Sequence, residues 1–185
     1  MVDDASADGV PWLDDEQAEA WLALVSILEV LPAALDSQLT HDADLTFFEF
    51  LVLVQLAETP GHRLRLSDLA TATHTSLPRL SRVVARLEAD GLVVREADTA
   101  DGRSRHARLS APGWRKLKAA APGHVELVQR IFVAPLSRGQ LGQLRGIGRR
   151  LMAELDPAHE VLRETRNATN GRPGLSRPPA PSTGD

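Results

Sequence analysis

The sequence predicts a mainly α-helical protein with one small β-hairpin, and three observations support this fold class. Apolar residues recur at helical spacing over residues 14–39. The capping boxes TFFE at 46–49 and SRGQ at 137–140 each predict the beginning of a further helix. In residues 92–110 the pattern changes to two short runs of β-forming residues, LVVRE and HARLS, around a polar loop, which predicts a hairpin.

The first predicted helix, residues 14–39, is apolar on more than one side. Trp21, Leu24 and Leu28 lie on one stripe, and further apolar residues lie off it. A helix of this kind needs partners on two faces. Pro32 predicts a bend or an interruption.

Three helices are predicted between this first helix and the hairpin. The second helix of the chain begins at the capping box at 46–49 and ends before the breaker TPG. Ser67 is expected to cap a short third helix, and Thr75 or Ser76 a fourth, which ends with Gly91 as its C′ residue. The core face of the fourth helix is predicted to carry Leu77, Leu80, Val83, Val84 and Leu87.

Two more helices are predicted after the hairpin. Ser110 is expected to cap the first of them, with Pro112 in its first turn and a kink at Pro122. The last helix begins at the capping box at 137–140. Its apolar side is predicted to carry Leu141, Leu144, Ile147, Leu151 and Leu155.

Composition excludes several classes of function. The chain contains no cysteine, which excludes disulfides, thiolate metal sites and cysteine-based redox sensing. Its six histidines show no close metal-ligand spacing, so we expect no metal site. The sequence lacks a Gly-rich phosphate loop, a GxSxG motif and a paired-carboxylate motif, so we expect neither an enzyme nor a cofactor. No apolar run approaches the roughly 18 residues of a membrane span, and the acidic N-terminus does not fit a signal peptide, so a cytoplasmic protein is expected.

The charge pattern indicates a partner for the central block. The whole chain has a formal net charge of −4, yet residues 62–118 carry an excess of basic residues. Three helices followed by a hairpin form a winged helix-turn-helix, whose last helix enters the major groove of DNA. Arg79, Arg82 and Arg86 fall together on that helix, away from its core face. Guanidinium groups match guanine edges and phosphate oxygens, so this pattern predicts DNA binding.

The run RLSDLATATHTSLPRLSRVVARLEADGLVVREADTADGRSRHARLSAPG resembles the multiple antibiotic resistance regulator (MarR) family of bacterial transcription factors. Ser110 stands where such regulators usually carry threonine, a departure that keeps a capping hydroxyl. The resemblance implies a homodimeric regulator of palindromic operators, most simply a repressor. It is carried by Leu69-Ala70, Ser81-Arg82, Arg86-Leu87-Glu88, Gly91-Leu92-Val93, Arg95, Asp101-Gly102-Arg103, Leu109-Ser110 and Gly113.

The loop TADGRSRHARLS is then the wing, whose tip is expected to enter the minor groove. Arg103 is the residue we expect there, because narrow minor grooves attract arginine. Gly102 permits the tight turn, and the resemblance implies that Asp101 buttresses the wing through an arginine. Whether Arg105 and Arg108 contact phosphate or solvent stays open. The predicted DNA-binding residues are Ser76, Pro78, Arg79, Ser81, Arg82, Arg86, Arg103 and Arg105.

The resemblance also implies that the terminal helices of two chains interleave into a dimer, the alternative being a monomer with a long helical hairpin. The interface candidates are Trp21, Leu24, Leu28, Leu144, Ile147 and Leu151. A small-molecule pocket between the dimer helices and the DNA lobe is implied as well, for a small apolar or phenolic effector. Its candidate lining residues are Trp21, His41, Phe48 and His124.

These expectations divide the chain into five parts. They are a flexible N-terminus (1–13), an N-terminal dimerisation helix (14–44), a winged helix-turn-helix DNA-binding domain (45–110), C-terminal dimerisation helices (111–156) and a mostly disordered tail (157–185). The predicted function is sequence-specific DNA-binding regulation of transcription, and the resemblance implies its relief by a small-molecule ligand. The alternative is a protein-interaction module whose basic face docks an acidic partner.

Overall fold

The computed structural model describes residues 10–97 and 105–156, and within them it confirms a mainly helical fold with a small sheet. The wing tip and the tail, with the expectations placed on them, lie outside these residues. The elements in chain order are α1 (Asp15–Ala43), α2 (Phe47–Ala57), the 3-10 turn η1 (Pro60–His62), β1 (Arg63–Arg65), α3 (Leu66–Ala72), α4 (Leu77–Ala89), β2 (Val93–Ala97), β3 (Arg105–Leu109), α5 (Ala111–Val128), the π-helical η2 (Gln129–Val133) and α6 (Arg138–Leu155).

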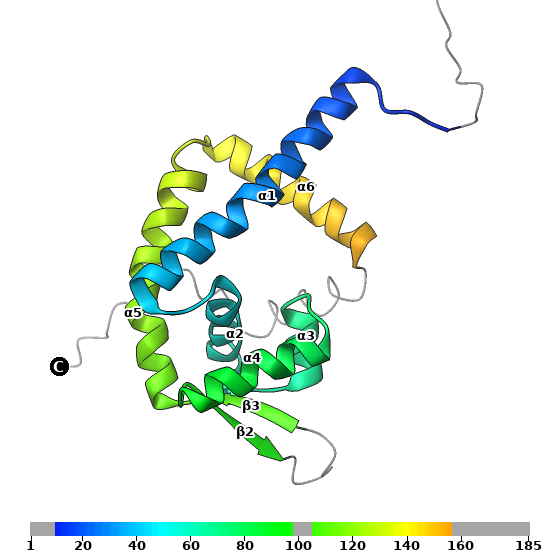
Figure 1. Ribbon diagram of the computed structural model, residues 1–185. Coiled ribbons are helices and arrows are strands. Elements are labelled where there is room, and N and C mark those ends of the chain that lie inside the picture. Colours follow the sequence, from blue (N-terminus) through cyan, green and yellow to red (C-terminus); the bar gives the residue numbers. More distant parts are fainter. Residues whose placement is uncertain (1–9, 98–104, 157–185) are drawn as a thin grey trace, which may run out of the picture.

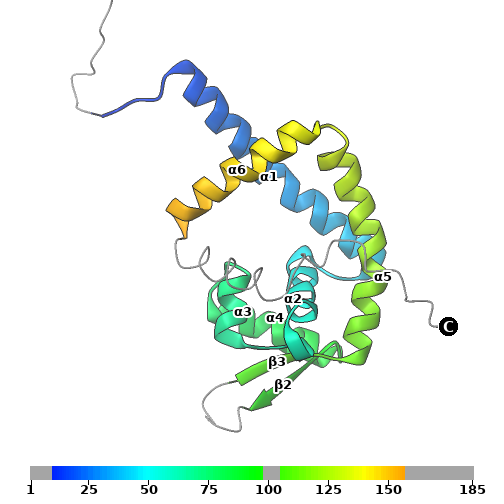
Figure 2. The same ribbon diagram turned by 180° about the vertical axis from the view of Figure 1, so that it is seen from behind.

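The helices divide into an arch and a lobe. Figure 1 shows α1, α5 and α6 as the arch, with α2, α3, α4 and the hairpin β2–β3 gathered beneath it. The view from behind shows the same division, with α5 running from the arch down to the hairpin (Figure 2). The lobe has the element order and arrangement of a winged helix-turn-helix.

α1 is longer than the sequence predicts and continues through Pro32 to Ala43. Asp14 caps it, accepting a hydrogen bond from the Gln17 backbone N–H at 2.8 Å. The expected interruption at Pro32 does not occur, because the C-terminal half of α1 packs on α5 and buries Leu35. Tertiary packing here outweighs the local cost of one proline.

α2 lies at the centre of the core. The predicted capping box is confirmed, since the Glu49 backbone N–H donates to Thr46 Oγ1 at 3.2 Å and the Glu49 carboxylate accepts from the Thr46 backbone N–H at 2.8 Å. Phe50, Leu53 and Leu56 of this helix are fully buried. α2 therefore serves as the platform on which α1, α3 and α5 pack.

The sheet has three antiparallel strands in the order β1-β3-β2. The sequence predicted the β2–β3 hairpin and missed β1, because three residues are too short to show a period. β1 pairs Leu64 with Ala107 of β3, which is fully buried. This strand extends the wing and leads directly into α3.

That direct connection corrects one predicted cap. α3 begins at Leu66 with Arg65 as its N-cap, so Ser67 lies inside the first turn and does not cap it. The Ser67 hydroxyl instead donates to Asp68 Oδ1 at 3.1 Å.

α4 begins and ends close to the predicted residues. Ser76 is the N-cap, although its side chain makes no capping hydrogen bond. Gly91 follows the helix with φ of +70°, and the Leu92 backbone N–H donates to the Leu87 carbonyl at 2.8 Å, the pattern of a Schellman motif. Leu77, expected in the core, is 46% exposed, because it lies in the first turn and the helix meets the core only from Leu80 onward.

The last two helices begin where the sequence predicts. Ser110 Oγ accepts from the Gly113 backbone N–H at 3.0 Å and donates to the Gly91 carbonyl at 2.6 Å, so it caps α5 and ties it to the end of α4. α5 continues without interruption through Pro122. The helix changes to the wider π-helical form of η2 only at Gln129. α6 has its predicted capping box at Ser137, and no residue of α6 is buried.

α1 passes the length and composition test for a membrane span, although the sequence has no uninterrupted apolar run of that length. By length and composition this helix could cross a membrane, since an 18-residue window in it has a mean hydropathy of 1.7. The feature was missed because single polar residues interrupt its apolar runs. It is weak evidence for a span, because a helix that packs on protein passes the same test. Only 6% of the window is buried within one chain, so its apolar surface is left to be covered by another partner.

Candidate nucleic-acid interface

α4 separates into a buried face and a charged face, as the sequence predicts. Leu80, Val84 and Leu87 are fully buried in the core. Arg79 and Arg82 are exposed on the remaining surface of the helix. The other predicted contacts on this helix also remain reachable, since Ser76 and Pro78 are exposed and Ser81 is half-buried.

Arg79 rests on an aromatic ring of α2. Its guanidinium carbon lies 5.2 Å from the centroid of the Phe48 ring. A cation–π contact of this kind orients the planar group while leaving its N–H donors available. Phe48 therefore supports the charged face of α4.

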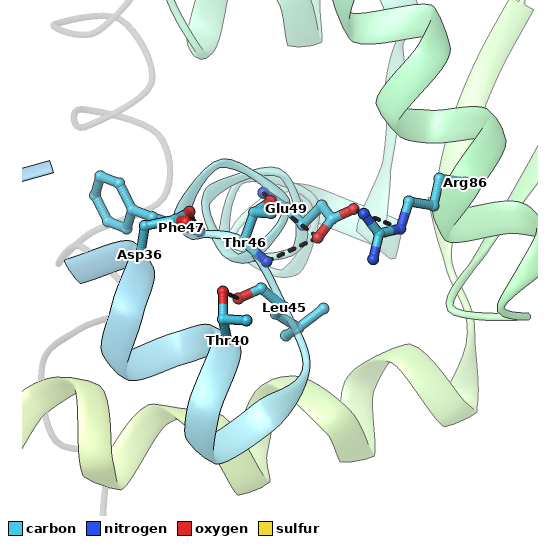
Figure 3. Close-up of polar contacts among 7 residues, drawn as sticks. All are labelled: Asp36, Thr40, Leu45, Thr46, Phe47, Glu49 and Arg86. Carbon is cyan, nitrogen blue, oxygen red and sulfur yellow. Dashed lines mark hydrogen bonds and ion pairs between the residues drawn. The ribbon is translucent and has the colours of Figure 1, made fainter. Parts of the chain in front are cut away.

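Arg86 differs from the other two arginines because it has an acidic partner inside the protein. Its Nε lies 3.2 Å from Glu49 Oε1, and the Glu49 side chain is only 4% exposed (Figure 3). The Arg86 side chain itself is 58% exposed. Sequence reasoning identified Glu49 as a helix cap and missed this pair, because the two residues lie on different helices and no local signal joins them.

The base of the wing is held by Glu96, the fourth of the five residues of β2. Its carboxylate accepts from Arg108 Nε at 2.6 Å and from Arg63 Nε at 3.1 Å. Arg63 and Arg108 are register partners on β1 and β3, so the carboxylate neutralises two like charges that lie opposite each other. The hydrogen bond from Arg108 is the main cause that holds the pKa of Glu96 below its usual range. Arg108 thus has a partner within the sheet.

Glu88 ties the wing to the last turn of α4. The hydrogen bond from the Arg95 side chain is the main cause of its lowered pKa, to which the nearby charge of Arg105 adds. Arg105 begins β3 and is exposed. The wing tip itself, with the predicted residues Asp101, Gly102 and Arg103, lies outside the described residues.

The four candidate pocket residues do not come together in one chain. Trp21 and His41 lie twenty residues apart on α1, about 30 Å along a helix that rises about 1.5 Å per residue. The His41 side chain is 88% exposed, and Trp21 is 55% exposed. The sequence could not predict these distances, because the type of a side chain does not show where it lies in the fold.

His124 is buried in the core, between α5 and α2. Its ring lies 4.6 Å from the ring centroid of Phe50 and 6.0 Å from that of Phe47. Its Nδ1 is buried and has no hydrogen-bond partner. Burial lowers the pKa of this imidazole, which keeps it neutral.

A surface opening of about 480 Å³ lies beside the turn between α3 and α4. His74 Nδ1 lies 3.3 Å from Asp156 Oδ2, so this turn touches the end of α6. None of the predicted pocket residues lines the opening. Within the described ranges, no group of three or more metal-ligating side chains is close enough to hold an ion.

The interface candidates on α1 and α6 present apolar surface. Trp21, Leu28 and Ile147 are each more than half exposed, at 55%, 59% and 51%. Leu144 and Leu151 are exposed to a lesser degree, at 43% and 44%, and Leu24 is half-buried. Exposed apolar surface of this kind is typical of a site of association.

This fold and this charged face define a winged helix-turn-helix protein, and comparison with known proteins gives its family. A model of the MarR family matches residues 43–104. Sco3205, a MarR family transcriptional regulator from Streptomyces coelicolor solved in complex with DNA, is 36% identical, with a TM-score of 0.77 over 80% of this chain and 96% of that one. AbsC, a MarR family regulator from the same organism, is 35% identical, with a TM-score of 0.71 over 84% of this chain and 99% of that one. The chain belongs to the MarR family.

A curated relative is matched over a shorter stretch. The transcriptional regulator HosA of Escherichia coli O127:H6 is 39% identical over 80 residues. That stretch covers 43% of this chain and 57% of HosA, so the match spans less than two thirds of the relative's length.

Proposed function

We propose that this protein is a homodimeric transcription regulator that binds DNA through α4 and the wing. The observation that carries the proposal is the pair of exposed arginines, Arg79 and Arg82, on the face of α4 that turns away from buried Leu80. A helix so placed, with a hairpin beside it, has the geometry that reads a major groove. The likeness to Sco3205, solved in complex with DNA, supports the same use of this lobe.

The proposed dimer is supported by the surface that one chain leaves open. α1 is 29 residues long, yet among its residues only Leu35 and Leu39 are buried. α6 buries none of its residues. A two-fold partner that covers both helices would place two copies of α4 about one turn of DNA apart, which suits a palindromic operator. Because the proposed partner is DNA, the proposal places the protein in the cytoplasm.

The finer points of regulation remain predictions. Repression, as opposed to activation, depends on where the operator lies relative to a promoter. Relief by a small apolar or phenolic ligand needs a pocket, and two of the four side chains expected to line it, Trp21 and His41, lie about 30 Å apart along α1. Two protomers would have to build such a pocket together.

A selection from genomic DNA at near-physiological salt tests the proposed function. We expect recovery of one inverted repeat whose half-sites lie about one helical turn apart. Arg79→Ala and Arg82→Ala should each weaken binding to that site, with a loss of about 1–3 kcal/mol where the arginine reads a base. Arg149→Ala is the matched control, because it removes an exposed arginine from α6, a helix of the arch that lies outside the DNA-binding lobe (Figure 1).

The rival function gives a different result. A protein-interaction module would recover genomic fragments uniformly, and that binding would fade as salt rises. Uniform recovery, together with equal binding by the Arg79→Ala and Arg149→Ala variants, would overturn the proposed function.

A further inference from the structure

The carboxylate of Glu49 serves two helices at once. One oxygen, Oε2, accepts from the Thr46 backbone N–H at 2.8 Å and from the Thr46 hydroxyl at 2.9 Å, which caps α2. The other oxygen, Oε1, faces Arg86 Nε of α4 at 3.2 Å (Figure 3). The cap and the ion pair therefore use separate oxygens of one buried side chain.

The same turn is also tied to α1. The Phe47 backbone N–H donates to Asp36 Oδ1 at 2.8 Å, and the Thr40 hydroxyl donates to the Leu45 carbonyl at 3.4 Å. Three helices thus meet at the N-terminus of α2: α1 through Asp36, α2 through its cap, and α4 through Arg86. Under the proposed function, this junction lies between the dimer helix and the DNA-reading helix.

The positions of the three arginines on α4 show what the junction controls. A helix turns by roughly 100° per residue, so Arg79 and Arg86 lie within about 20° of each other, and Arg82 lies about 40–60° further from the core. Arg79 and Arg86 meet adjacent residues of α2, one over the Phe48 ring and one beside Glu49. Two contacts on one line of a helix fix its rotation about its own axis.

Burial of Glu49 makes the ion pair specific. A carboxylate that is almost fully buried is costly unless it is paired and hydrogen-bonded, so its partners define a narrow set of arrangements. Any rotation of α4 that took Arg86 away would leave this charge without its cation. An exposed pair would tolerate such a rotation, because water would replace the partner.

We propose that Glu49 is a positioning residue that sets the rotation of α4 through Arg86, and that Arg86 is a structural anchor rather than a DNA contact. The proposal rests on the proposed function, since it concerns how the reading helix presents Arg82 and its neighbours to DNA. It assigns the three arginines different tasks: Arg86 holds the helix, Arg79 is oriented on Phe48, and Arg82 points outward.

The test uses Glu49→Gln, Arg86→Gln and the double variant in the full-length protein. Glutamine at 49 keeps an oxygen acceptor for the cap of α2 and removes the charge. Arg86→Gln leaves a buried carboxylate without its cation, so the double variant, which carries two amides, keeps the test valid if that single variant fails to fold. Binding is measured against the inverted repeat from the genomic selection and against a scrambled duplex, each over a series of salt concentrations.

We expect Glu49→Gln to lower the preference for the repeat over the scrambled duplex by about tenfold, because misplaced base contacts lose discrimination. The salt dependence of binding should stay unchanged in all three variants, since no phosphate contact is lost. The double variant should lose no more of this preference than either single variant, because all three variants disrupt the same ion pair.

Three results would overturn the proposal. Arg86→Gln could lower the salt slope by about one unit, which would make Arg86 a phosphate contact. Glu49→Gln could leave the preference intact. Both duplexes could lose affinity equally, which would mean only a smaller folded fraction. A wild-type protein with no preference for the repeat would instead overturn the proposed function itself.

Discussion

Arg95 binds Glu88 through both its side chain and its backbone, with its Nε 2.6 Å from Oε2 and its backbone N–H 3.2 Å from Oε1 of the same carboxylate. Glu88 belongs to the last turn of α4, and Arg95 belongs to β2. The pair therefore joins the reading helix to the wing at the point where the chain passes from one to the other. The direction of the wing depends on α4 through this pair.

Glu88→Gln should weaken binding to the operator while changing thermal stability little. The substitution removes the charge that aims Arg95 and β2. Each of the two side chains is about one-third exposed, and surface ion pairs of this kind add little to stability. Fluorescence anisotropy and thermal denaturation of the same samples measure the two effects. Glu126→Gln, which removes an exposed carboxylate from α5, is the control, and an equal loss in that variant would contradict the role of the pair.

The close approach of α5 to the end of α4 predicts a strong effect at Gly113. A Cβ at this position would lie 2.0 Å from the backbone oxygen of Leu92 and 2.9 Å from Leu109 Cδ1. Backbone cannot yield as a flexible side chain can, so Gly113→Ala should destabilise the fold by about 3 kcal/mol or more. Urea denaturation measures the change in the free energy of unfolding.

Gly142→Ala provides the comparison for that substitution. Nothing lies within 4 Å of the position where its Cβ would stand. Gly142 lies inside α6, where alanine is favoured over glycine by about 0.5–1 kcal/mol. We therefore expect opposite signs for two identical substitutions, and destabilisation of similar size in both would show that the contact with Leu92 is not the cause.

The buried imidazole of His124 makes stability depend on pH. Its pKa is lowered by burial from the usual value of 6.5, so the unfolded chain binds a proton at a pH where the folded chain does not. Stability should therefore fall as pH drops below about 6.5 and level off below the folded pKa. His124→Phe should remove this part of the pH dependence. Urea titrations at about pH 7.5 and pH 5.5 measure the change in the free energy of unfolding between the two pH values. His41→Gln is the control, because His41 is exposed. If the change in His124→Phe equals that of the wild-type protein, His124 is not its source.

Much of this fold follows from local signals in the sequence. The capping boxes at Thr46 and Ser137, the C′ glycine at Gly91 and the cap at Ser110 each involve residues within a few positions of one another. Such signals depend on hydrogen bonds inside one turn, so they are readable without knowledge of the tertiary structure. The two faces of α4 follow from periodicity for the same reason.

The parts that sequence could not predict are those that depend on distant partners. β1 is defined only by its pairing with β3, and the ion pair of Glu49 with Arg86 joins two helices that no local pattern connects. Leu77 has the right spacing for the core and lies outside it, because the core does not extend to the first turn of α4. The four predicted pocket residues share only an aromatic or imidazole side chain, and the length of α1 separates two of them.

The apolar surface of α1 and α6 predicts that a single charge will separate the dimer. Ile147 is 51% exposed within one chain and lies between Leu144 and Leu151 on the apolar side of α6. A carboxylate buried there against a partner would lack a cation, so Ile147→Glu should weaken self-association by several kcal/mol, about the cost of an unpaired buried charge. Sedimentation equilibrium over a range of concentrations measures this effect. Arg149→Glu, on the polar side of the same helix, should leave the dimer intact. A monomer in the wild-type protein, or equal dissociation in both variants, would contradict the placement of the interface on this face.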